Sequence, residues 1–194
     1  MNDGNKLSRR EFVKMTTLGA GALSLAVGSL SVIGGCSSSP KPSNYFFSES
    51  EIKLMEAIAE QIIPTDEWPG GRDVGVVNFI DKQLVGPYLR FQQDYRKGFE
   101  ALEKTCENKF HSKFEKLSWD SQTSVLKDME AGKLEGDAWK NDFSKYYFEL
   151  LRSHCMQGYY GSPRHGGNKN YTSYKMIGID QPPIIGENRD GIKL

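Results

Sequence analysis

Apolar residues recur three and four positions apart along most of residues 47–157, which is the spacing of one face of an α-helix. The first such stretch begins after Ser48 and stops at Pro64. Ser48 and Glu51 have the spacing of a capping box, and proline lacks the amide hydrogen that a continuing helix needs. The pattern therefore predicts a first helix between these two positions.

The same spacing predicts four more helices. Asp73 is expected to cap a second helix that extends to about Val85, where Gly86-Pro87 breaks the chain. Glycines at 132 and 158 are expected to end the last two helices. The predicted ranges are 89–113, 118–131 and 139–157. Because no stretch alternates with a period of two, we expect an all-α fold, a small bundle of about five helices over residues 47–157.

Residues 158–194 form a long C-terminal tail rich in glycine and aromatic residues, without a clear helical pattern. Loops of this length are usually functional or disordered, and disordered segments are poor in aromatic residues. We therefore expect an irregular but ordered tail that packs on the domain or on a partner. Its tyrosine, arginine and neighbouring polar side chains are candidates for a partner interface: Tyr159, Tyr160, Arg164, His165, Asn168, Tyr171 and Tyr174.

The N-terminal residues match an export signal. Arg9 and Arg10, with Phe12 and Lys14 after them, fit the twin-arginine signal that directs folded proteins across the bacterial cytoplasmic membrane. The uncharged run that follows is interrupted by glycine and serine, which makes it a poor membrane span, although an N-terminal anchor helix is the alternative. We predict that residues 1–35 are a removed signal peptide and exclude them from the fold.

Cys36 follows Ile33-Gly34-Gly35, which looks like a lipobox, where cleavage precedes a cysteine that carries lipid. Residues 36–46 would then be a lipidated cysteine and a flexible tether rich in serine and proline. This places the protein on the periplasmic side of a bacterial membrane, held there by a lipid anchor. Cys106 and Cys155 remain as a pair in an oxidising compartment, either as a disulfide or as two separate buried thiols.

Charge and motifs exclude several functions. The chain has 25 basic and 25 acidic residues, and this balance provides no electrostatic surface for nucleic acid. It lacks Cys-x-x-Cys-His, a phosphate-binding loop and a Gly-x-Ser-x-Gly motif, and its histidines, His111, His154 and His165, lack the spacing of a di-iron site. We expect no catalytic residue, metal or cofactor in this chain. His165, beside two glycines, is the one histidine in a plausible binding site.

Several segments together resemble the gluconate 2-dehydrogenase subunit 3 family. They are EAIAEQIIPTD at 56–66, GVVNFID at 75–81, and GYYGSP, GGN and YKMIG within 158–178. Family members usually have another aromatic residue where His165 stands and tryptophan where Tyr174 stands. The likeness covers nearly all of residues 47–194, and the tail is its most specific part.

The resemblance implies a non-catalytic small subunit of an oxidoreductase complex. In this family such subunits accompany a large FAD-containing dehydrogenase for sugars or sugar acids, and often a multihaem cytochrome c subunit. In several such systems the large subunit crosses the membrane as a folded passenger on the small one, which engages the twin-arginine translocase. The alternative from another class is an independent periplasmic lipoprotein, ligand-binding or enzymatic, with its site near His165.

Overall fold

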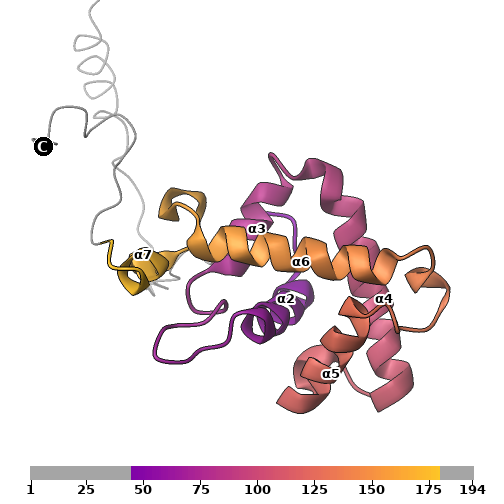
Figure 1. Cartoon of the computed structure of the whole chain (residues 1–194). Helices are drawn as coiled ribbons and strands as arrows, with labels where there is room; N and C mark the ends of the chain where they lie inside the picture. The colour runs from indigo at the N-terminus through magenta and orange to yellow at the C-terminus, as the bar shows by residue number, and fades with distance from the viewer. Residues whose placement is uncertain (1–44, 180–194) are drawn as a thin grey trace, which may run out of the picture. The chain divides into compact units, whose positions relative to one another are not determined.

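The computed structural model describes residues 45–179, and these residues form six α-helices and no β-strand (Figure 1). The export signal, Cys36 and the end of the tail lie outside the described residues. None of the helices within the described range is long and apolar enough to cross a membrane. The helices are α2 Glu49–Ile62, α3 Val76–Leu84, α4 Gln92–Phe110, α5 Trp119–Glu130, α6 Phe143–Tyr160 and α7 Thr172–Met176.

The start of α2 confirms the predicted capping box. The Ser48 side chain accepts a hydrogen bond from the Glu51 amide, and the Glu51 carboxylate accepts one from the Ser48 amide at 2.8 Å. Phe47, just before the cap, is buried and packs against the rings of Tyr95 and Phe99 on α4. Phe47 therefore belongs to the core although it precedes the first helix.

A buried carboxylate fixes this entry segment to α3. Asp81 is 4% exposed, and its two oxygens accept hydrogen bonds from the amides of Tyr45, Phe46 and Phe47 at 2.7–2.8 Å. Arg96 donates to the Phe46 carbonyl and stacks over the Phe46 ring. The domain therefore holds the chain firmly at the point where the predicted tether ends.

Three of the predicted helix boundaries are wrong, and two of these errors involve glycine packing. Asp73 does not cap α3; the helix begins at Val76, after Gly75 adopts a left-handed conformation with φ of +82°. The chain turns first because Gly71 lies against α2, where a Cβ would come within 2.6 Å of the Ala59 carbonyl oxygen. Likewise Gly158 does not end α6, which continues to Tyr160. The third error is the start of α6, which is Phe143 rather than residue 139, because Asn141 and Asp142 adopt left-handed conformations just before it.

The other helices are close to their predicted ranges. A turn of 3₁₀-helix, Leu89–Phe91, leads into α4, and α4 ends at Phe110, with His111 in a left-handed conformation. Ser118 caps α5, and Gly132 has φ of +69° just after it, as the prediction of a glycine stop requires.

Helix α6 is the centre of the bundle and packs against α2, α3 and α5 (Figure 1). It also lies antiparallel to α4, because Tyr95 of α4 contacts His154 whereas Thr105 contacts Trp139, which precedes α6. Gly98 makes this close packing possible. A Cβ at this position would lie 2.1 Å from the ring of Tyr147, so no larger residue fits without displacing that ring.

Cys106 and Cys155 are two separate buried thiols, the second of the alternatives that the sequence left open. Cys106 follows Thr105 on α4, whereas Cys155 follows His154, which contacts Tyr95. Tyr95 and Cys106 are separated by roughly 16 Å along α4, at about 1.5 Å per residue. A disulfide needs Cα atoms within about 7 Å. Burial also raises the pKa of Cys106 to about 12, which keeps this thiol protonated.

Candidate functional site

The tail is ordered from the end of α6 to residue 179 and is organised around Asn168. Two turns of 3₁₀-helix, Pro163–His165 and Lys169–Tyr171, lead into α7. Asn168 is fully buried and left-handed; its side chain donates to the Gly161 carbonyl and accepts from the Ser173 amide, each at 2.9 Å. One asparagine side chain therefore joins the end of α6 to the start of α7.

Hydrogen bonds attach the folded tail to the loop between α2 and α3. The Lys169 amide donates to the Val74 carbonyl at 2.9 Å, and the Tyr159 hydroxyl donates to the Pro69 carbonyl at 3.0 Å. Asn78 of α3 donates to the Gly166 carbonyl at 2.7 Å. We call residues 158–179, together with the loop 63–75 that they contact, the tail platform. Sequence segments almost a hundred residues apart thus meet at one end of the domain (Figure 1).

The seven tail residues singled out from the sequence divide into two groups. Tyr160 and Tyr171 are 42% and 45% exposed, Arg164 and His165 are also exposed, and Tyr174 is half-buried. These five side chains are available to a partner. Tyr159 and Asn168 are buried, so their assignment to an interface is wrong: their polar atoms are used inside the tail platform.

A shallow groove of about 570 Å³ lies beside the tail platform, between α3 and the end of α6. Tyr160 and His165 line it, as do residues that the sequence analysis missed. Met156 is one of these, and its position on the outward face of a predicted helix was the available signal. The groove is lined by Phe79, Gln83, Met156, Gln157, Tyr160, Gly161 and His165.

His165 is the one histidine that lines the groove. His165 is exposed, and the Arg164 side chain donates to its Nε2 atom at 3.2 Å. No carboxylate lines the groove to orient this imidazole as a general base. Within residues 45–179, no three His, Cys, Asp or Glu side chains cluster closely enough to hold a metal ion.

A family model decides the broader assignment. The model of gluconate 2-dehydrogenase subunit 3 matches residues 49–181, which includes all of the bundle and the tail platform. The chain belongs to this family. Neither a curated protein nor a solved structure matches it. As a member of the gluconate 2-dehydrogenase subunit 3 family, the chain is an accessory subunit whose partner is a dehydrogenase.

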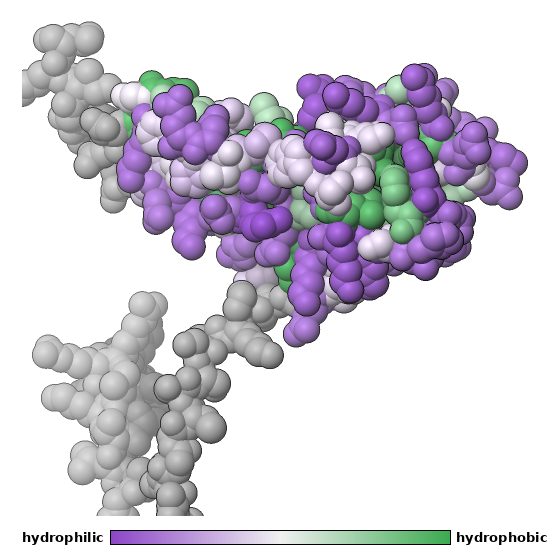
Figure 2. Space-filling model, turned by 90° about the horizontal axis from the view of Figure 1, so that it is seen from below, coloured by the Kyte–Doolittle hydropathy of each residue, from purple (hydrophilic) through white to green (hydrophobic). Residues whose placement is uncertain are grey.

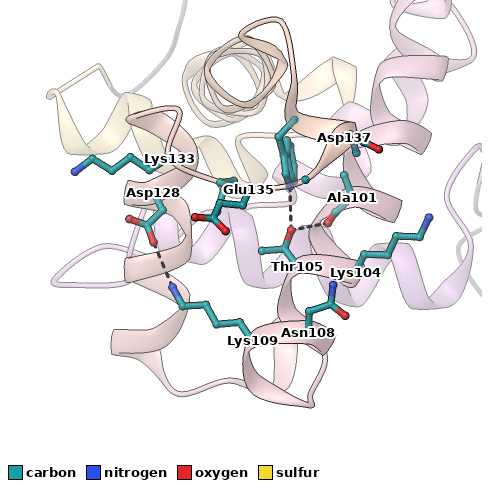
Figure 3. A pocket seen from close by; sticks show the side chains of 13 residues that line it. Ala101, Lys104, Thr105, Asn108, Lys109, Asp128, Lys133, Glu135 and Asp137 are labelled. Carbon is teal, nitrogen blue, oxygen red and sulfur yellow. Dashed lines mark hydrogen bonds and ion pairs between the residues drawn. The ribbon is translucent and has the colours of Figure 1, made fainter.

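The subunit has a larger cavity of about 710 Å³ at its opposite end, between α4, α5 and the loop before α6 (Figure 3). Lys109 and Asp128 pair across it at 3.4 Å, and the Trp139 ring nitrogen donates to Thr105 at 2.9 Å. These two interactions join α4 to α5 and to the segment before α6, and the segments that carry the family resemblance do not line the cavity. We therefore place the candidate site at the tail platform.

The outer surface of this subunit is mostly polar. Figure 2 shows hydrophilic residues over most of one face, with hydrophobic residues gathered in a small area near its middle. The large exposed apolar side chains include Trp119, which is 49% exposed at the start of α5. Trp119 is as exposed as Tyr160 and Tyr171, so it serves as a comparison for the tail platform.

A buried histidine, His154, lies next to Tyr88, whose hydroxyl donates to the groove residue Gln157. His154 is 3% exposed and is stacked under Tyr88 at 4.2 Å between ring centroids. Burial, with a smaller effect of the Arg90 charge, lowers the pKa of His154 from 6.5 to about 4. The imidazole is therefore uncharged at neutral pH, and it packs as a polar member of the core.

Because burial lowers the pKa of His154, we expect the folding stability of the chain to depend on pH. Between pH 4 and 6.5 the unfolded chain binds a proton at this position that the folded chain does not. Folding stability should therefore fall as the pH falls through this window, by on the order of 3 kcal/mol. Denaturant titrations of His154→Phe should show a smaller loss over the same range. An unchanged pH slope in the variant would contradict the assignment.

Proposed function

We propose that this chain is the non-catalytic small subunit of an exported FAD-dependent sugar or sugar-acid dehydrogenase complex. It binds the folded flavoprotein through the tail platform, accompanies it through the twin-arginine translocase and holds it at the membrane. FAD, and haem c where a cytochrome subunit is present, belong to the partner subunits. The complex would act on the periplasmic side of a bacterial membrane.

The observation that carries this proposal is the tail platform itself. Hydrogen bonds join the tail there to the loop before α3 and to Asn78 of α3, and the result presents exposed tyrosine, arginine and histidine side chains. Aromatic residues and arginine are enriched at the centres of protein interfaces. A rigid surface of this kind also loses little conformational entropy when a partner binds.

The N-terminal sequence supports the escort role. A small helical domain without a bound cofactor has no evident need of the twin-arginine route, which exports folded proteins. A flavoprotein that binds FAD before export does need it. Arg9 and Arg10 would then serve the partner as much as this chain, and lipid on Cys36 would anchor the complex. Because the amides of residues 45–47 bind Asp81, the folded domain would be attached firmly to the segment that carries the lipid.

Co-purification of the dehydrogenase tests the interface. Tyr160→Ser combined with Arg164→Ala is expected to lower recovery of the flavoprotein in mild detergent at least about tenfold, because two anchor side chains together are worth more than 1.4 kcal/mol. Both side chains are exposed, so the unfolding midpoint of the subunit should barely change.

Trp119→Ser is the matched control. It removes an aromatic ring of similar exposure from α5, away from the tail platform, and should leave recovery of the flavoprotein unchanged. Equal recovery with the double variant and with the wild type would contradict the proposed interface. Loss of the flavoprotein only with Trp119→Ser would move the interface to the α5 end.

A further inference from the structure

A continuous series of aromatic rings follows the α4–α6 contact. Ring centroids of Trp139 and Tyr147 are 6.4 Å apart, those of Tyr147 and Tyr95 6.1 Å, and those of Tyr95 and His154 5.9 Å. Tyr88 stacks on the other side of His154 at 4.2 Å. The series thus leads from a buried tryptophan through two buried tyrosines to the half-buried Tyr88.

Tyr95 differs from Tyr147, the buried tyrosine next to it in the series, in what its hydroxyl contacts. Its oxygen lies 2.9 Å from Nδ1 of His154, and both residues are buried. Tyr147 is equally buried, but its hydroxyl has no hydrogen-bond partner among the described residues. Loss of one electron makes a phenol a strong acid, so oxidation is easy only where a base can take the proton. A neutral imidazole at hydrogen-bond distance is such a base.

The pair lies close to the groove. Tyr88 covers His154, donates its hydroxyl to Gln157 and contacts the ring of Phe79 edge-on. Gln157 and Phe79 both line the groove beside the tail platform. An electron leaving Tyr95 therefore has a short aromatic path to that surface, whereas bulk water is excluded from Tyr95 itself, which is fully buried.

We propose that Tyr95 and His154 form a proton-coupled redox site that reduces strong one-electron oxidants, such as oxygen-derived radicals, reaching the groove. In this step one electron passes from Tyr95 to the oxidant, and the hydroxyl proton passes to Nδ1 of His154. The products are a neutral phenoxyl radical, an imidazolium ion and the reduced oxidant. The reverse transfers restore the pair when a reductant supplies an electron. The proposal concerns this chain alone and stands apart from its role as an escort.

The test uses the purified mature chain and a photo-oxidised ruthenium polypyridyl complex, with radicals followed by electron paramagnetic resonance. The wild type should give a long-lived phenoxyl signal, because burial prevents coupling of two radicals. Tyr95→Phe should abolish this long-lived signal, and His154→Phe, which keeps an aromatic ring but removes the base, should abolish it as well. Thermal unfolding of each variant establishes that it is folded.

Two control variants separate this site from ordinary tyrosine oxidation. Tyr147→Phe removes the buried hydroxyl without a partner, and Tyr45→Phe removes an exposed one; both should keep the long-lived signal. Deuterium oxide as solvent should slow formation of the radical in the wild type, since a proton moves with the electron. A long-lived signal in folded His154→Phe equal to that of the wild type, or one unaffected by Tyr95→Phe, would overturn the proposal.

Discussion

Asp81→Ala is expected to lower the free energy of unfolding by about 4 kcal/mol, since each hydrogen bond to a charged group contributes roughly 1.5–3 kcal/mol and the freed amides regain only part of this from water. The carboxylate accepts from three consecutive amides, of which the Phe47 amide is buried. Releasing residues 45–47 also removes the Phe47 ring from its contacts with Tyr95 and Phe99. Urea titration followed by circular dichroism measures the change.

Asp73→Ala is the control for the Asp81 prediction. Asp73 is exposed and comes before α3, so its replacement should change stability by less than about 0.5 kcal/mol. Similar losses of stability in the two variants would contradict the account of the entry segment, because they would show that the buried carboxylate has no special role.

Asn168→Ala should release the tail, with a loss of about 3 kcal/mol in the local stability of residues 158–179. One buried and one partly buried hydrogen bond disappear, and alanine tolerates the left-handed conformation less well than asparagine. Amide hydrogen exchange should show faster exchange in the tail while α4 and α5 stay protected. Because the tail platform carries the proposed interface, recovery of the flavoprotein should fall at the same time.

Asn170→Ala isolates the contribution of backbone strain. Asn170 is also left-handed, with φ of +58°, but its side chain is exposed. Its replacement should cost at most about 1–2 kcal/mol and leave the tail folded. If Asn168→Ala behaved no differently from Asn170→Ala, the hydrogen bonds of Asn168 would not be what holds the tail platform together.

The sequence predicted best those features that depend on neighbouring residues. The capping box of Ser48 and Glu51 and the glycine stop after α5 are local, and both are confirmed. The start of α3 was misplaced because Gly71 has to lie against the Ala59 carbonyl, a contact between separate elements. Gly158 was taken for a helix end, whereas the structure uses its missing Cβ to bring α6 close to Phe79.

The candidate site was predicted in part for the same reason. Composition identified the tail and its aromatic residues, and Tyr160 and Tyr171 are exposed as an interface requires. Composition could not show that Tyr159 and Asn168 face inward, because their partners are the carbonyls of Pro69 and Gly161. The Asp81 attachment was missed as well, since an aspartate in an apolar helix gives no sign of which amides it will bind.

The central claim is that this chain escorts a folded dehydrogenase across the membrane. Export of the flavoprotein tests this claim most directly. The measurement is dehydrogenase activity and FAD in the periplasmic and cytoplasmic fractions of cells that express both subunits, with Arg9 and Arg10 either intact or both replaced by lysine. We predict that the flavoprotein reaches the periplasm only with the arginines intact and otherwise stays, folded and loaded with FAD, in the cytoplasm. Equal periplasmic activity in both strains would contradict the account.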